Sequence, residues 1–115
     1  MGGKLNIRPE VNLIKDKIIN WRRDFHQYPE LSFEEYLTSE KIGDYLKSMG
    51  LNPKMKVGKT GVIADISWGS GPTIALRADM DALPIQEKRG LEYSSKHEGV
   101  MHACGHDAHM AILLG

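Results

Sequence analysis

The sequence of 115 residues has few of the features that mark specialised protein classes. Its single cysteine, Cys104, excludes an internal disulfide and predicts a reducing, cytoplasmic location. Fifteen basic and fifteen acidic residues cancel, so the composition does not indicate nucleic acid or an anionic membrane as a partner. No apolar run approaches the roughly 20 residues of a transmembrane helix, and the first residues lack the hydrophobic segment of a signal peptide.

The rest of the composition is that of an ordinary globular protein, with 41% hydrophobic and 26% charged residues. Pro9 is typical of the first turn of a helix, and apolar residues then recur at spacings of three and four as far as Phe25. Tyr28-Pro29 should end this helix. The sequence therefore predicts an amphipathic helix in the first quarter of the chain.

A second helix is predicted after Pro29. Ser32 and Glu35 fit a capping box at its start, in which each side chain bonds the backbone N–H of the other residue. Gly50 fits a left-handed cap at its end, with Leu51 directly behind it.

Period-two patterns follow and predict β-strands. Residues 62–68 alternate between two faces, and the continuous apolar run 73–76 predicts a central strand, with a shorter strand near 55–57. Residues 86–99 are polar and are expected at the surface, whereas 108–114 have helical composition. This order predicts an α/β fold in which the sheet is still incomplete.

Candidate metal ligands are concentrated at the end of the chain: His102, Cys104, His106, Asp107 and His109. In an extended segment Cys104 and His106 would point to the same side and could face one ion. The alternative is a buried cysteine beside histidines that cap a helix. Asp107 could serve as a helix N-terminal charge or accept a hydrogen bond from a ligand imidazole. A structural zinc site would need a second ligand pair, which the chain lacks, so a catalytic site is favoured.

A second group, Arg77, Asp79 and Asp81, directly follows the most apolar predicted strand, where functional groups collect in α/β sheets. Two neighbouring carboxylates repel unless a cation neutralises them. Arg77 could serve one carboxylate and a metal the other. The alternative is a solvated turn.

Three segments together resemble the signatures of the metal-dependent amidohydrolases of the aminoacylase–carboxypeptidase type, which include N-acyl-amino-acid, hippurate and auxin-conjugate hydrolases. They are Trp21–Glu35, Arg77–Pro84 and Met101–His109. The resemblance implies that residues 1–115 are the N-terminal portion of a mixed-sheet, zinc-peptidase-like catalytic domain, truncated before the rest of that domain and a dimerisation domain. It also implies two divalent metal ions (Zn, Mn, Co or Ni), an N-acyl amino acid or small peptide as substrate, and a homo-oligomeric complete enzyme.

The resemblance assigns roles to particular residues. Cys104 and His106 match the metal ligands, and Asp81 matches a catalytic-site aspartate, although Asp79 stands where a histidine ligand is usual. Arg23 and His26 are expected to be structural. The general base, a glutamate, would lie outside the chain, so this chain alone is expected to be inactive. Two alternatives stay open: a non-catalytic metal-binding truncation product, and a thiol hydrolase with Cys104 as nucleophile.

Overall fold

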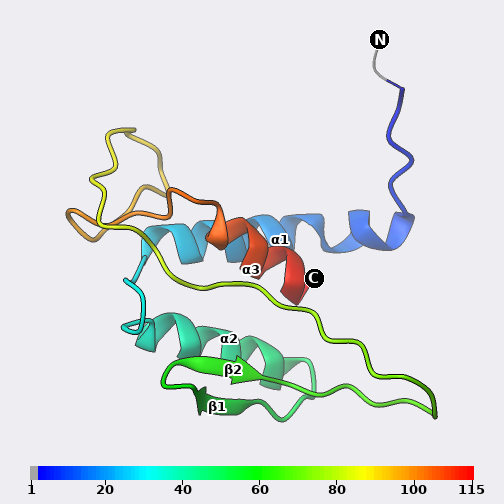
Figure 1. The fold of residues 1–115 in the computed structure, drawn as a ribbon. Coiled ribbons are helices and arrows are strands. Elements are labelled where there is room, and N and C mark those ends of the chain that lie inside the picture. The colour runs from blue at the N-terminus through cyan, green and yellow to red at the C-terminus, as the bar shows by residue number, and fades with distance from the viewer. Residues whose placement is uncertain (1–2) are drawn as a thin grey trace.

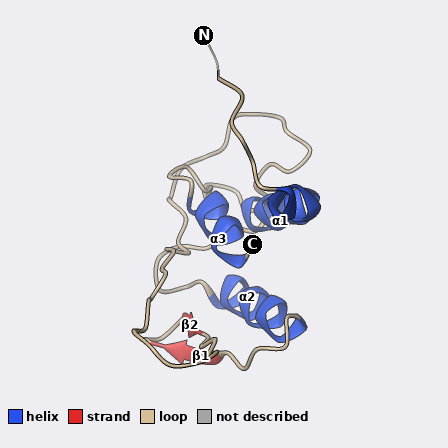
Figure 2. Ribbon diagram, turned by 90° about the vertical axis from the view of Figure 1, so that its right-hand side faces the viewer, coloured by secondary structure: helices blue, strands red, loops and turns tan. Residues whose placement is uncertain are grey.

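The computed structural model describes residues 3–115 and contains three helices and one small sheet (Figure 1). The helices are α1 (Pro9–Gln27), α2 (Tyr36–Ser48) and α3 (His106–Leu114), and the strands are β1 (Lys54–Val57) and β2 (Gly61–Ile63). Figures 1 and 2 show two layers, with α1 beside α3 in one layer and α2 beside the hairpin in the other. The predicted α/β character is confirmed. No helix within residues 3–115 has the length and apolar character needed to cross a membrane.

Helix α1 has the predicted bounds and packs its C-terminal half into a small core. Trp21 and Phe25 are buried there against Met110 and Ala111 of α3. The first half of the apolar stripe lies outside this core, and Val11 is half exposed. The helical period of the sequence is therefore realised along all of α1, but only its second half contributes to the core.

The start of α2 differs from the predicted capping box. Ser32 makes no hydrogen bond to the helix, and Glu35 accepts hydrogen bonds from the backbone N–H of Phe33 and the hydroxyl of Thr60 instead. The carboxylate of Glu30 takes over the capping role. It accepts bonds from Leu37 N at 3.1 Å and Thr38 N at 2.6 Å, together with one from the Thr38 hydroxyl. Because a carboxylate has two oxygens, one upstream residue satisfies two unpaired helix donors.

The end of α2 forms as predicted. Gly50 has a φ of 84°, in the left-handed region that favours glycine. Its N–H donates to Lys47 O at 2.9 Å, and Leu51 N donates to Leu46 O at 3.1 Å. These two bonds are the Schellman pattern, which satisfies carbonyl groups of the last helical turn.

The predicted sheet is only partly present. The strand expected near 55–57 is confirmed as β1, which pairs antiparallel with β2, but β2 ends at Ile63 and does not reach Trp68. The expected central strand 73–76 is wrong for this structure: Ile74 and Leu76 are exposed and unpaired. An apolar run becomes a strand only where a neighbouring strand accepts its hydrogen bonds, and none lies beside 73–76 within residues 3–115.

Two isolated β-bridges bring the three signature segments together. Leu31 pairs with Ala82 in parallel, and Leu83 pairs with Met101 antiparallel. In the second bridge, each residue donates its N–H to the other's carbonyl, at 2.9 and 3.0 Å. Residues 84–100 leave this contact as a loop without helix or strand, as expected for 86–99, and the bridge at Met101 then leads into α3 (Figure 1).

Candidate metal centre

His106 is held by the segment that carries Asp81. The Nδ1 atom of His106 lies 2.9 Å from the backbone oxygen of Asp81 and 3.0 Å from its carboxylate Oδ1. Both atoms are acceptors, so Nδ1 carries a proton and donates to them. The proton-free position of the neutral ring is then Nε2, the nitrogen that can bind a metal ion. His106 therefore has the tautomer and the oxygen partner of a typical metal ligand.

Cys104 lies two residues earlier, and its side chain is exposed to solvent. The expectation that Cys104 and His106 share one side of an extended segment is wrong. Gly105 between them has a φ of 91° and a ψ of 12°, which is left-handed and not extended. Within residues 3–115, no three His, Cys, Asp or Glu side chains are placed to hold one metal ion. The structure thus offers at most a pair of ligands here.

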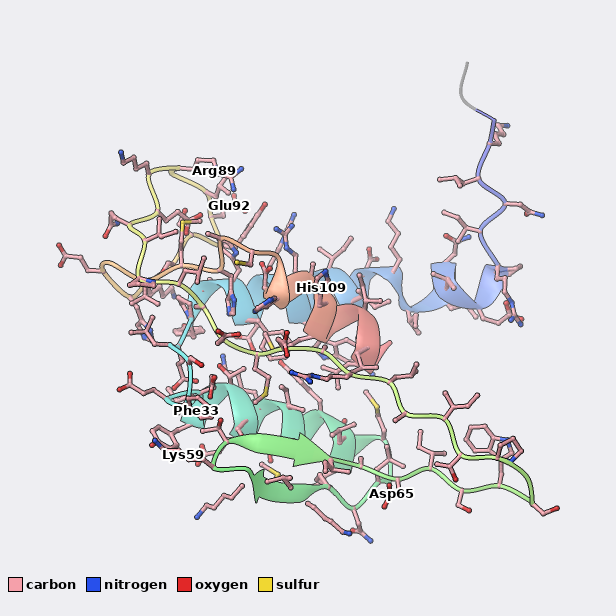
Figure 3. All side chains as sticks on the ribbon, in the orientation of Figure 1. Phe33, Lys59, Asp65, Arg89, Glu92 and His109 are labelled. Carbon is pink, nitrogen blue, oxygen red and sulfur yellow. The ribbon has the colours of Figure 1, made fainter. Side chains whose placement is uncertain are left out.

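The other two histidines of the cluster differ sharply from each other. His109 is exposed on α3, and its ring centroid lies 6.0 Å from that of His106 (Figure 3). His102 is buried, with 4% of its surface accessible, and neither of its ring nitrogens has a hydrogen-bond partner within the described chain. Burial lowers the pKa of His102 to about 4, so its ring is neutral at pH 7.

The two carboxylates after the predicted central strand have separate partners. Arg77 Nη2 donates to Asp79 Oδ1 at 2.8 Å, on an exposed part of the chain. The hydrogen bond and the charge of Arg77 lower the pKa of Asp79. The expectation that Arg77 neutralises one carboxylate is confirmed. Asp81, the second, faces His106.

A charged cluster adjoins the candidate ligands, formed by the buried side chains of His26, Glu87 and Asp107 together with the half-exposed side chain of Arg22. The ring of His26 stands between two carboxylates, with Nδ1 2.8 Å from Asp107 Oδ2 and Nε2 3.0 Å from Glu87 Oε1. Arg22 Nε also donates to Asp107 Oδ2, at 3.1 Å. Asp107 therefore bonds residues of α1. It makes no hydrogen bond to the His106 imidazole within the described residues. The possibility that Asp107 accepts a hydrogen bond from this ligand is therefore not realised here.

Both buried acids are held in the ionised state. Burial alone would raise the pKa of Asp107, but hydrogen bonds from His26 and the backbone N–H of Ala108, together with the charge of Arg22, outweigh it and lower this pKa. Burial opposes ionisation of Glu87 as well. There the backbone N–H of Ser95 and the ring of His26 outweigh it and lower the pKa. Both carboxylates are thus held as anions by donors on Asp107 Oδ2 and on both oxygens of Glu87, whereas Asp107 Oδ1 has no hydrogen-bond partner within the described residues.

Sequence reasoning missed Glu87 and Arg22 as members of this cluster. Glu87 lies in the polar stretch expected at the surface, yet only 2% of its side chain is accessible. Its neighbours Arg89 and Glu92 do lie on the outer part of that loop (Figure 3). A single buried carboxylate in a polar run leaves no periodic signal. Only its distant partner, His26, distinguishes it from the charged residues around it.

Comparison with known proteins gives concordant results. Residues 75–115 match the profile of peptidase family M20/M25/M40. The chain is 57% identical over 108 residues to the N-acetyl-L-cysteine deacetylase of Bacillus subtilis, a match that covers 91% of this chain and 26% of that protein. It is 48% identical to the N-acyl-L-amino acid amidohydrolase of Geobacillus stearothermophilus, with 97% of this chain and 30% of that protein covered.

A solved structure agrees with these sequence matches. The YXEP protein of Bacillus subtilis, described as a dinuclear metal binding peptidase from the M20 family, superposes with a TM-score of 0.84 and 48% sequence identity. The match covers 90% of this chain and 30% of that one. This chain thus spans less than a third of the length of these relatives. In its signature segments, its sequence matches and its fold, the chain is similar to members of peptidase family M20/M25/M40, whose profile matches residues 75–115.

Proposed function

We propose that this chain supplies the first metal ligands of a two-metal amidohydrolase that cleaves the amide bond of N-acyl amino acids or small peptides. The observation that carries the proposal is the orientation of His106. Its Nδ1 is occupied by the oxygens of Asp81, which leaves Nε2 as the free donor. The relatives named above as an amidohydrolase, a deacetylase and a dinuclear metal binding peptidase support the same assignment.

The donor chemistry suits a borderline divalent ion. Cys104 would contribute a thiolate and His106 a neutral imidazole, the two ligand types that zinc and its neighbours prefer. When bound, the metal ions would supply Lewis acidity, lowering the pKa of water and polarising the scissile carbonyl group. Two ligands do not fill a metal site, so we propose that this chain alone binds metal weakly and has little or no amidase activity.

Asp81 has a positioning role in this proposal. Its backbone oxygen and its carboxylate both lie on Nδ1 of His106, so it holds the ring in one tautomer and one orientation. Asp81 was expected to be a catalytic residue. The contacts support an action through His106, because the carboxylate is directed at that ring.

Several wider proposals follow from the family. Residues 1–115 would form the N-terminal portion of the catalytic domain, and the complete enzyme would be a homo-oligomer with its general base elsewhere in the polypeptide. A protein that needs Cys104 as a free thiolate is suited to a reducing compartment, so we also propose a cytoplasmic location.

Cobalt binding tests the ligand assignment directly. Co²⁺ coordinated by a thiolate gives a near-ultraviolet charge-transfer band, which can be followed during a titration of the full chain. We expect the band in the unaltered protein, no band in Cys104→Ala, and binding weaker by roughly 10-fold or more in His106→Ala. His109→Ala is the matched control, because this histidine lies three residues further on and is outside the proposed ligand set. An unchanged titration of Cys104→Ala would contradict the proposal.

The thiol-hydrolase alternative has less support. Cys104 forms no hydrogen bond to a histidine within residues 3–115, and His26 and His106 are both engaged with oxygen acceptors. In a complete enzyme, chelators should abolish activity, whereas alkylation of the metal-loaded protein should not. The reverse pattern would favour Cys104 as a nucleophile.

A further inference from the structure

The His26 ring occupies an unusual position between two buried anions. The side chains of His26, Asp107 and Glu87 are 1–2% accessible, and the two ring nitrogens lie 2.8 and 3.0 Å from different carboxylates. These three residues belong to three separate segments: α1, the first turn of α3, and the loop of residues 84–100. One ring therefore connects parts of the chain that are more than sixty residues apart.

The two contacts require two protons on the ring. An ionised carboxylate can only accept hydrogen bonds, and a neutral imidazole has a single N–H. With a neutral ring, one carboxylate would face a lone pair at about 3 Å where solvent has little access, which is a costly arrangement. With both nitrogens protonated, each carboxylate receives one hydrogen bond from the ring.

The charges around the ring support this state. Arg22 and His26 would contribute two positive charges and Asp107 and Glu87 two negative ones, so the cluster is neutral as a whole. Tyr93 covers the edge of the His26 ring at a centroid distance of 5.6 Å. The guanidinium groups of Arg22 and Arg23 lie 5.9 and 4.8 Å from the Tyr93 ring. No other charged side chain forms a hydrogen bond or ion pair with His26 among the described residues.

We propose that His26 is a doubly protonated positioning residue that donates one hydrogen bond to Asp107 and one to Glu87, and thereby fixes the first turn of α3 that carries His106. Asp107 directly follows His106, so a displacement of Asp107 would move the candidate ligand away from Asp81. Only the consequence for the metal ligand His106 rests on the proposed metal-binding function. The protonation state of His26 can be tested without any metal.

The first experiment measures the ring protons of His26 in the full chain at neutral pH. Side-chain ¹⁵N–¹H correlation spectra distinguish a ring with two protonated nitrogens from either neutral tautomer, and comparison with His26→Gln assigns the signals. We expect both nitrogens of His26 to be protonated, whereas His102 should give a neutral ring. A neutral His26 would overturn the proposal, whatever the protein binds.

The second experiment measures the effect on the metal ligands by Co²⁺ titration of the same chain. His26→Gln should weaken binding roughly 10-fold, because the first turn of α3 that carries His106 would no longer be fixed and the ligand would lose its orientation. The matched control is His97→Gln. His97 lies in the same loop as Glu87 and donates to or accepts from no carboxylate among residues 3–115; its Nδ1 bonds the carbonyl oxygen of Pro29. It should stay within about twofold of the unaltered protein.

The outcomes separate this inference from the proposed function. Absence of a thiolate–cobalt band in the unaltered protein would contradict the proposed function. The ¹⁵N–¹H spectra would then still decide whether His26 is doubly protonated. Equal Co²⁺ affinity of the unaltered protein and His26→Gln would overturn the positioning role while the metal site stands. If His26→Gln loses its helical circular dichroism, Glu87→Ala takes its place, because it removes one of the two contacts. We expect a several-fold weaker affinity, and an unchanged affinity would overturn the proposal.

Discussion

At the scale of single residues, the packing and pKa of polar side chains depend on partners that are distant in sequence, as Tyr45 shows. Tyr45 in α2 packs against Trp21 and Phe25 of α1 with ring centroid distances of 5.5 and 6.1 Å. Its hydroxyl donates to Asp24 Oδ2 at 3.0 Å. Burial, this hydrogen bond and the Asp24 charge together raise the pKa of Tyr45 to about 12.

The raised pKa of Tyr45 predicts a loss of stability in alkaline solution. Because the pKa is higher in the folded state than its ordinary value of 10, the contribution of Tyr45 is complete below pH 10 and is lost as the pH rises from about 10 to 12. Urea unfolding should show that the free energy of unfolding falls less steeply over this range in Tyr45→Phe than in the unaltered protein. Tyr36→Phe is the control, since Tyr36 is exposed. Equal slopes for all three proteins would contradict the raised pKa of Tyr45.

At the scale of elements, α2 shows that the two ends of a helix can be set by different means. Its C-terminal end depends on Gly50 and on bonds within six residues of the chain. Its N-terminal end depends on the carboxylate of Glu30, which lies outside the capping-box spacing. The backbone oxygen of Glu30 also accepts a hydrogen bond from Ala82 N at 2.8 Å. Glu30 thus joins the start of α2 to the segment that carries Asp81.

The capping role of Glu30 predicts a clear difference between two alanine variants. Glu30→Ala leaves Leu37 N and Thr38 N without their acceptor and should lower the free energy of unfolding by about 1–2 kcal/mol. Ser32→Ala removes the residue that sequence patterning would select as the cap, and should change it by less than about 0.5 kcal/mol. Urea denaturation followed by circular dichroism measures both. A larger loss for Ser32→Ala than for Glu30→Ala would contradict the observed cap.

At the scale of the whole molecule, the apolar surface is unevenly covered. The core lies between α1 and α3, with Ile42 and Tyr45 of α2 packed against it, whereas β2, α2, α3 and the run 73–76 line an open apolar groove. Large side chains along the unpaired stretch are exposed: 62% for Ile66, 81% for Trp68, 83% for Ile74 and 77% for Leu76. An exposed apolar area of this kind is unusual for a single soluble chain and marks a surface suited to contact.

This exposed run predicts strong binding of a hydrophobic dye such as anilinonaphthalene sulfonate to the isolated chain. Replacing Ile74 and Leu76 with threonine should lower the dye fluorescence clearly, because both side chains are more than three-quarters exposed. Leu13→Thr is the control, because Leu13 is an exposed apolar residue of α1 that lies outside this run. A buried residue of α1 would not serve, since replacing it would unfold the core. Dye fluorescence that is insensitive to Ile74→Thr/Leu76→Thr would mean that this run is covered.

The sequence alone determined the features that depend on neighbouring residues. The bounds of α1, the glycine-terminated end of α2, the helix at the end of the chain and the three signature segments all follow from short-range periodicity and from residue types at short spacings. Cys104 and His106 could be selected as candidate ligands in the same way, because ligand chemistry is a property of the side chain itself.

Only the tertiary structure decided which partner each polar group has. The cap from Glu30, the contact of Asp81 with His106 and the bridge of His26 between Asp107 and Glu87 join residues whose separation leaves no pattern in the sequence. The run 73–76 has the composition of a strand but remains unpaired. A helix closes its hydrogen bonds within one segment, whereas strands and buried ions need partners from elsewhere, so they depend on which other parts of the chain lie beside them.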